Sequence, residues 1–192
     1  ATSLSTSYRH LMTSRTVHFL IVEGYQALDL AGPMAVYSTA NDICSNAYDL
    51  VTLGLGDGAT KSNAGLTPVP GASIHDLEPP HTLVFVGGPG ARKAKLACRD
   101  ADRLRELAQR STRVISICTG SFIAAQLGLL DDHVTTTHWR HQDELEKRFR
   151  KTKLEHDRLY TVDGKYWSSA GVTAGIDLAL AIVREDLGDT IA

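Results

Sequence analysis

One cysteine lies where a strand-like run passes into a helix-like run. Cys118 follows the apolar run RVISI (113–117), and Thr119 and Gly120 lead into a second apolar run with helical spacing. A side chain at such a junction projects from the carboxyl edge of a sheet, where the first N–H groups of the helix favour an anion. We therefore predict that Cys118 is exposed, with a depressed thiol pKa and a thiolate able to attack a substrate. A small buried cysteine without chemistry is the alternative.

A second candidate is Asp29, which lies between two leucines in the stretch LDLAGP. We expect this stretch to be a loop after the first strand, so that the carboxylate either caps a helix or turns inward. Beside Cys118, Asp29 would accept protons during catalysis.

A third candidate is the glycine-rich stretch FVGGPGA, which places Gly87 and Gly88 at the end of another strand. These glycines match neither of the common nucleotide-binding motifs. Their backbone N–H groups would suit an oxyanion hole or a carboxylate-binding surface, although a simple turn would have the same sequence.

Metal and cofactor sites are not expected. His138 and His141 can share one face of a helix, but no carboxylate or third ligand accompanies them at a fitting spacing. We predict a solvated or packing role for both histidines. Cys44, Cys98 and Cys118 are widely spaced and include no C-x-x-C pair, which argues against a zinc site and against a disulfide framework. Free thiols of this kind indicate a reducing, cytoplasmic location.

Buried strands and helices alternate along the chain and must position these residues. Continuous apolar and β-branched runs predict strands buried on both faces of a parallel sheet, at 16–22, 48–55, 82–86 and 113–117. Helical spacing predicts helices at 33–41, 95–110, 139–149 and 172–188, with Pro33 at the start of the first and another helix between Cys118 and Gly128. Asp163-Gly164 predicts a hairpin, and 133–138 a further strand. This order is typical of one α/β domain over 16–192, which we expect to follow a disordered tail over 1–15.

Charge and hydropathy limit what the chain can bind. The formal net charge of its 192 residues is -2, whereas a nucleic-acid-binding domain normally carries a clustered basic excess. We do not expect this domain to bind DNA by itself. No apolar stretch reaches the roughly 20 residues that span a bilayer, and the N-terminus does not read as a signal peptide, so no membrane contact is expected.

Three motifs resemble those of the ThiJ/PfpI superfamily, whose fold is similar to that of class I glutamine amidotransferases. They are SICTGSFIAAQLGLLDD, TTTHWR and SSAGVTAGIDLALAIVREDLG. The resemblance extends over about 16–188 and is closest to the N-terminal sensor domain of AraC-family transcriptional regulators. It implies a flavodoxin-like three-layer α/β sandwich with a mostly parallel sheet, a strand-Cys-helix nucleophile elbow and a homodimer.

The resemblance to these regulators implies a non-catalytic domain that senses a small metabolite, such as an amino-acid-related or quaternary-amine compound. Asp29, Gly88, Cys118 and Thr119 would form its pocket at the carboxyl edge of the sheet. The DNA-binding helix-turn-helix domain of such a regulator would be a separate unit, absent from this chain.

An enzyme is the alternative within the same superfamily. The chain is similar to isonitrile hydratases, which implies a cofactor-free hydro-lyase with Cys118 as nucleophile, assisted by Asp29 and Thr119. The residues Ser168–Ala170 differ from the glycines usual in those enzymes. Proteases and deglycases of the superfamily usually have histidine after the cysteine, and Thr119 departs from that pattern. A redox-sensing Cys118 is a third possibility.

Overall fold

A seven-stranded sheet organises the part of the chain that the computed structural model describes, residues 14–192. The strands lie in the order β3-β2-β1-β4-β5-β9-β8, and all neighbours are parallel except β8 and β9. Their bounds are β1 Arg15–Leu20, β2 Tyr48–Gly54, β3 Ala72–Ser73, β4 Thr82–Phe85, β5 Arg113–Ile117, β8 Tyr160–Asp163 and β9 Tyr166–Ser169. The carboxyl ends of the central strands β1, β4 and β5 therefore meet at one edge of the sheet.

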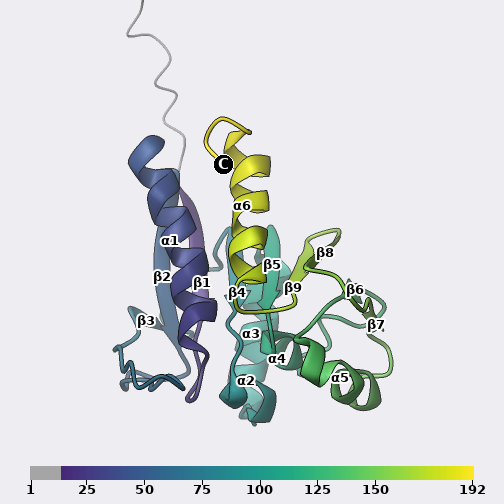
Figure 1. Cartoon of the computed structure of the whole chain (residues 1–192). Coiled ribbons are helices and arrows are strands. Elements are labelled where there is room, and N and C mark those ends of the chain that lie inside the picture. The colour runs from purple at the N-terminus through teal and green to yellow at the C-terminus, as the bar shows by residue number, and fades with distance from the viewer. Residues whose placement is uncertain (1–13) are drawn as a thin grey trace, which may run out of the picture.

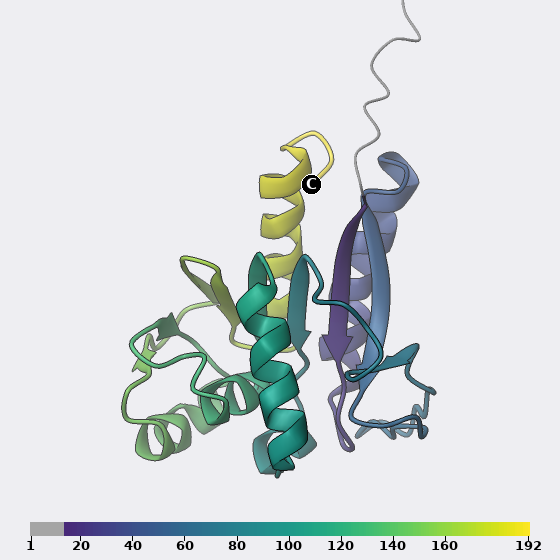
Figure 2. The same ribbon diagram turned by 180° about the vertical axis from the view of Figure 1, so that it is seen from behind.

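Helices cover both faces of this sheet. In Figure 1, α1 (Ala27–Ile43) and α6 (Ala174–Leu187) pack side by side on the near face. Figure 2 shows α3 (Cys98–Arg110) on the opposite face, which it shares with α4 (Gly120–Gln126), while the short α2 (Pro89–Lys93) contacts α4. The molecule is thus the predicted flavodoxin-like, three-layer α/β sandwich with a mostly parallel sheet.

Each face of the sheet has its own apolar core, because both faces of the central strands carry apolar side chains. The core beneath α1 and α6 includes Phe19, Tyr37, Ile115, Ile117 and Leu178. The core beneath α3 and α4 includes Leu20, Leu83, Phe85, Leu104 and Phe122. Burial on both faces fixes the positions of β4 and β5, whose ends carry Gly87, Gly88 and Cys118.

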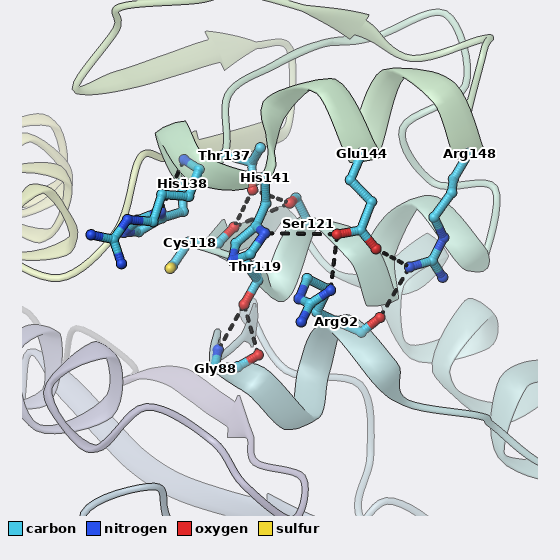
Figure 3. Close-up of polar contacts among 11 residues, drawn as sticks. Gly88, Arg92, Cys118, Thr119, Ser121, Thr137, His138, His141, Glu144 and Arg148 are labelled. Atoms are coloured by element: carbon cyan, nitrogen blue, oxygen red, sulfur yellow. Dashed lines mark hydrogen bonds and ion pairs between the residues drawn. The ribbon is translucent and has the colours of Figure 1, made fainter.

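Between α4 and β8 the chain leaves the main sheet and forms a smaller lobe. It contains a second, two-stranded sheet of β6 (Val134–Thr135) and β7 (Lys153–Leu154). A 3-10 turn, η1 (Trp139–His141), and the helix α5 (Gln142–Arg148) connect these two strands. The lobe matters for the site because η1 lies next to Cys118 (Figure 3).

The predicted central strands and the hairpin are confirmed, with Gly164 at a positive φ of 59° in the turn between β8 and β9. The loop predicted for LDLAGP was wrong, since α1 begins at Ala27, includes Asp29 in its first turn and has Pro33 in its interior. Proline inside a helix normally disrupts it, but Pro33 belongs to the buried face that packs on the sheet, and that packing outweighs the lost hydrogen bond. The strand expected at 133–138 is limited to Val134–Thr135.

The tail predicted at 1–15 lies outside the described residues except for Ser14 and Arg15, and Arg15 begins β1. Among the described helices, none has the length and apolarity needed to cross a bilayer.

Candidate functional site

Cys118 occupies the sharp turn between β5 and α4. Its φ is 55°, a left-handed conformation that is uncommon outside glycine, and its N–H donates to the carbonyl oxygen of Ser169 at 2.9 Å. The carbonyl oxygen of Cys118 accepts hydrogen bonds from the hydroxyls of Ser121, at 3.1 Å, and Thr137, at 2.9 Å. The turn is held by β9, α4 and the smaller lobe together, as Figure 3 shows for the two hydroxyls.

Asp29 lies directly behind this cysteine, in the first turn of α1. Its side chain is inaccessible to solvent, and its Oδ1 accepts the N–H of Val172 at 2.9 Å. A β-carbon added to Gly87 would lie 2.5 Å from Asp29 Oδ2 and 2.6 Å from Cys118 Cβ, so the carboxyl and the cysteine border the same space. Burial raises the pKa of Asp29 to about 6, against the opposing effect of hydrogen bonds from Val172 and Cys118. The structure therefore brings together two of the predicted site residues.

The prediction of an exposed cysteine with a depressed thiol pKa was wrong. Only 6% of Cys118 is exposed, and burial, together with the charge of Asp29, raises the pKa of its thiol above the ordinary value. The Thr119 N–H acts in the opposite direction but does not compensate, and α4 is a helix of only seven residues. At neutral pH Cys118 is therefore a neutral thiol, and the adjacent carboxyl of Asp29 has a pKa of about 6.

Thr119 and Gly88 are bound to each other. The Gly88 N–H donates to Thr119 Oγ1 at 2.8 Å, and the same hydroxyl donates to the Gly88 carbonyl oxygen at 2.8 Å (Figure 3). Gly88 has a φ of 137° and packs against the backbone of Gly24 and Gln26, where a β-carbon would not fit. The Gly88 N–H, which we predicted as a possible oxyanion-hole donor, therefore already donates to Thr119 Oγ1.

An open cavity of about 200 Å³ lies over Cys118 at the carboxyl edge of the sheet. It is lined by Gln26, Asn63, Gly88, Pro89, Arg92, Cys118, Thr119, His138, Arg140, His141 and Val172. Three of the four predicted pocket residues therefore line it, and Asp29 lies behind its wall.

His138 and His141 belong to this cavity wall, so the packing or solvated role predicted for them was incomplete. The two histidines have no third metal ligand at a fitting spacing in the sequence, and no local pattern indicates that η1 carries both rings to the cavity. In the described residues no group of three or more metal-ligating side chains occurs. Arg92 and Arg140 were also missed, because Arg92 follows the glycine-rich stretch without a motif of its own and Arg140, although it ends TTTHWR, was given no role there.

The charged part of the wall forms a connected network. Glu144 accepts a hydrogen bond from Arg92 at 2.9 Å and one from Arg148 at 3.1 Å, and it lies 3.7 Å from His141 Nδ1 (Figure 3). Burial lowers the pKa of His141, and the charges of Arg92 and Arg140 lower it further, against the opposing effect of Glu144. Burial, His141 and Arg140 likewise lower the pKa of His138. Both rings are therefore neutral at pH 7.

Similar proteins include an enzyme and a regulator. The isonitrile hydratase of Pseudomonas putida is 30% identical over 90% of this chain and 72% of its own length. The HTH-type transcriptional regulator GlxA of Rhizobium meliloti is 29% identical over 92% of this chain, which spans 54% of that regulator.

A solved structure and a family model both match nearly the whole of this chain. The crystal structure of an AraC family transcriptional regulator from Pseudomonas putida superimposes with a TM-score of 0.80, at 24% identity, over 92% of this chain and 95% of that chain. The family model described as the DJ-1/PfpI family matches residues 15–185. The chain therefore belongs to the DJ-1/PfpI family.

Proposed function

We propose that this domain binds a small metabolite in the cavity over Cys118 and acts as the sensor of an AraC-type transcriptional regulator. The proposal depends on one contrast: the cavity wall offers polar groups for binding, whereas Cys118 and Gly88 are not prepared for catalysis. Polar side chains from several segments converge on the open cavity, whereas Cys118 is a neutral thiol and the Gly88 N–H is already bonded. This arrangement favours recognition of a ligand over attack on it.

The turn after β9 offers a route from the cavity to α6. Val172 lines the cavity, donates its N–H to Asp29 and has a φ of 45°, which is strained for a β-branched residue. Two residues later α6 begins at Ala174 and packs along α1. A ligand with different affinities for two arrangements of this turn would shift α6, and through it a DNA-binding module of the regulator.

A thermal-shift screen of a metabolite library against this chain tests the proposal. We expect at least one compound to raise the unfolding temperature and to remain chemically unchanged after prolonged incubation. Cys118→Ser should keep that stabilisation, because the side chain only lines the site. The proposal is overturned if no compound stabilises the domain while an isonitrile is converted by the protein.

An isonitrile hydratase activity is the second candidate, favoured by the pairing of Asp29 with Cys118. The Cys118 thiol would add to the isonitrile carbon. Sulfur would bond to this carbon, and the thiol proton would be transferred to it as well, to give a thioimidate. Water would then add to this carbon and the thiol would leave with its proton restored, so that the product is the N-substituted formamide. Asp29, with a pKa of about 6, would carry the proton between these groups.

Product analysis separates the two candidates. An alkyl isonitrile incubated with the wild-type chain should give no formamide if the domain is a sensor. Formamide production that disappears in both Cys118→Ala and Asp29→Asn, with the fold intact, would establish the enzyme instead.

A further inference from the structure

The wall of the cavity is cationic on the side built by α2 and η1. Arg92, His138, Arg140 and His141 all line it, and no aspartate or glutamate is among the described lining residues. Asp29 is the nearest buried carboxyl, but it is inaccessible and engaged with Val172. A cationic group on a ligand would find no charged partner in this wall.

The two arginines of the wall differ in how they are neutralised. Arg92 pairs with Glu144, a carboxylate that Arg148 shares, and the Nε of Arg92 is buried without a hydrogen-bond partner among the described residues. Arg140 makes no ion pair and no side-chain hydrogen bond within residues 14–192; its guanidinium lies 4.8 Å from the centre of the Trp139 ring. The cavity wall therefore holds at least one uncompensated positive charge, and among the described residues the guanidinium donors of Arg140 have no partner.

The histidines add neutral donors rather than further charge. His138 Nδ1 accepts the backbone N–H of Arg140 at 3.2 Å, which places the proton of the neutral ring on Nε2. Gln26 and Asn63 line the cavity as well. One free cation surrounded by neutral polar groups suits a single carboxylate on a polar small molecule.

We propose that the ligand is a small monocarboxylate without an ammonium group, such as a hydroxy or oxo acid, and that Arg140 binds its carboxylate. This inference rests on the proposed ligand-binding function. It replaces the amino-acid-related or quaternary-amine ligand expected from the resemblance, because such a ligand would bring a positive charge into a positive cavity. A volume of about 200 Å³ is below the range of about 300–1,000 Å³ typical of drug-sized ligands, which favours a compact molecule.

Two matched ligand series test this proposal by isothermal titration calorimetry. The three-carbon series is lactate, alanine and lactamide, and the six-carbon series is 2-hydroxyhexanoate, norleucine and 2-hydroxyhexanamide. Within each series the size stays nearly constant, while an ammonium group replaces the hydroxyl in the amino acid and an amide replaces the carboxylate in the amide. We expect the hydroxy acid of at least one series to bind about tenfold or more tightly than its amino-acid and amide partners.

Arg140→Gln should weaken hydroxy-acid binding by about tenfold to a hundredfold, because it removes the charge-assisted hydrogen bonds. Arg140 is exposed, so the variant should unfold at the same temperature as the wild type. Arg158→Gln is the control, since Arg158 is exposed, pairs with Glu155 and does not line the cavity. It should leave binding unchanged.

The remaining outcomes would overturn the carboxylate assignment, and they do so separately from the sensor function. Equal or tighter binding of the amino acid, or equal affinities in Arg140→Gln and wild type, would overturn the carboxylate assignment while the sensor function stands. Inorganic phosphate binding as tightly as the hydroxy acid would show an unspecific anion site and would also overturn it. If neither series binds, the assignment is wrong, and the metabolite screen then decides separately whether the cavity binds any small molecule.

Discussion

Replacing Asp29 with asparagine tests the electrostatic description of the site. The pKa of this carboxyl is raised from 3.8 to about 6 in the folded protein, mainly by burial. A raised pKa means that the folded state prefers the protonated carboxyl, so the contribution of Asp29 to stability is highest below about pH 4 and falls as the pH rises through about 6. At 1.36 kcal/mol per pKa unit, the loss is about 3 kcal/mol above pH 7.

Asparagine keeps an oxygen that can accept the Val172 N–H but cannot ionise. The unfolding free energy of Asp29→Asn minus that of the wild type should therefore increase by about 2–3 kcal/mol between pH 4 and pH 8. Urea unfolding of both proteins across this range measures the difference. Asp102→Asn is the matched control, because the Asp102 side chain is 76% exposed on α3, and its difference should change little.

Asp29→Asn should also change the reactivity of Cys118. Because the charge of Asp29 raises the thiol pKa of Cys118, Asp29→Asn should lower that pKa and speed alkylation of Cys118 at pH 8. A stability difference that stays constant between pH 4 and pH 8 would refute the buried-carboxyl reasoning, and unchanged alkylation would refute its coupling to the thiol.

Three further substitutions test contacts at the site and an ion pair at the opposite end of β5, all by urea unfolding. Gly171→Ala should destabilise the domain by about 1–3 kcal/mol, because Gly171 has a φ of 108° and the new β-carbon would lie 2.6 Å from Cys118 Sγ. Gly128→Ala is the control: Gly128 also has a positive φ, 74°, but its β-carbon would meet no neighbour within 4 Å, so the loss should be only about 1 kcal/mol. Thr119→Val should lose about 1–3 kcal/mol because both polar groups of Gly88 lose their partner, and Thr119→Ser should restore most of it; equal losses in the two variants would contradict the role of the hydroxyl. Arg113→Met should lose about 3 kcal/mol because the buried carboxylate of Asp186 loses its closest ion-pair partner and keeps only Arg15 at 3.9 Å and the Tyr48 hydroxyl at 3.0 Å. The double variant Arg113→Met/Asp186→Leu should be more stable than the single one.

The sequence was sufficient to predict the sheet because its central strands are buried on both faces. Short runs rich in β-branched residues, such as VISI at 114–117, are typical of such strands. The Asp163-Gly164 hairpin follows from the backbone conformation that its turn requires. The start of α1 was missed because Pro33 is a strong local signal, and only the packing of α1 on the sheet overrides it.

The site was predicted in part. Cys118, Gly88 and Thr119 follow buried strands, so their meeting at one edge could be inferred from the parallel topology. The state of Cys118 could not, because a thiol pKa depends on burial and on the facing carboxyl rather than on its place before a helix. Arg140 and the two histidines reach the cavity through the smaller lobe, whose path no local pattern specifies. The homodimer expected from the resemblance stays a prediction, which sedimentation analysis of this chain would check.

Protection of Cys118 from alkylation tests the central claim most directly. The site-specific rate of N-ethylmaleimide labelling is measured by peptide mass spectrometry, with and without the library compound that stabilises the domain most. Cys98, which is exposed at the start of α3, serves as the internal control. If the cavity over Cys118 is the ligand site, the compound slows labelling of Cys118 and leaves Cys98 unchanged. Labelling of Cys118 at the same rate in both samples would contradict the account.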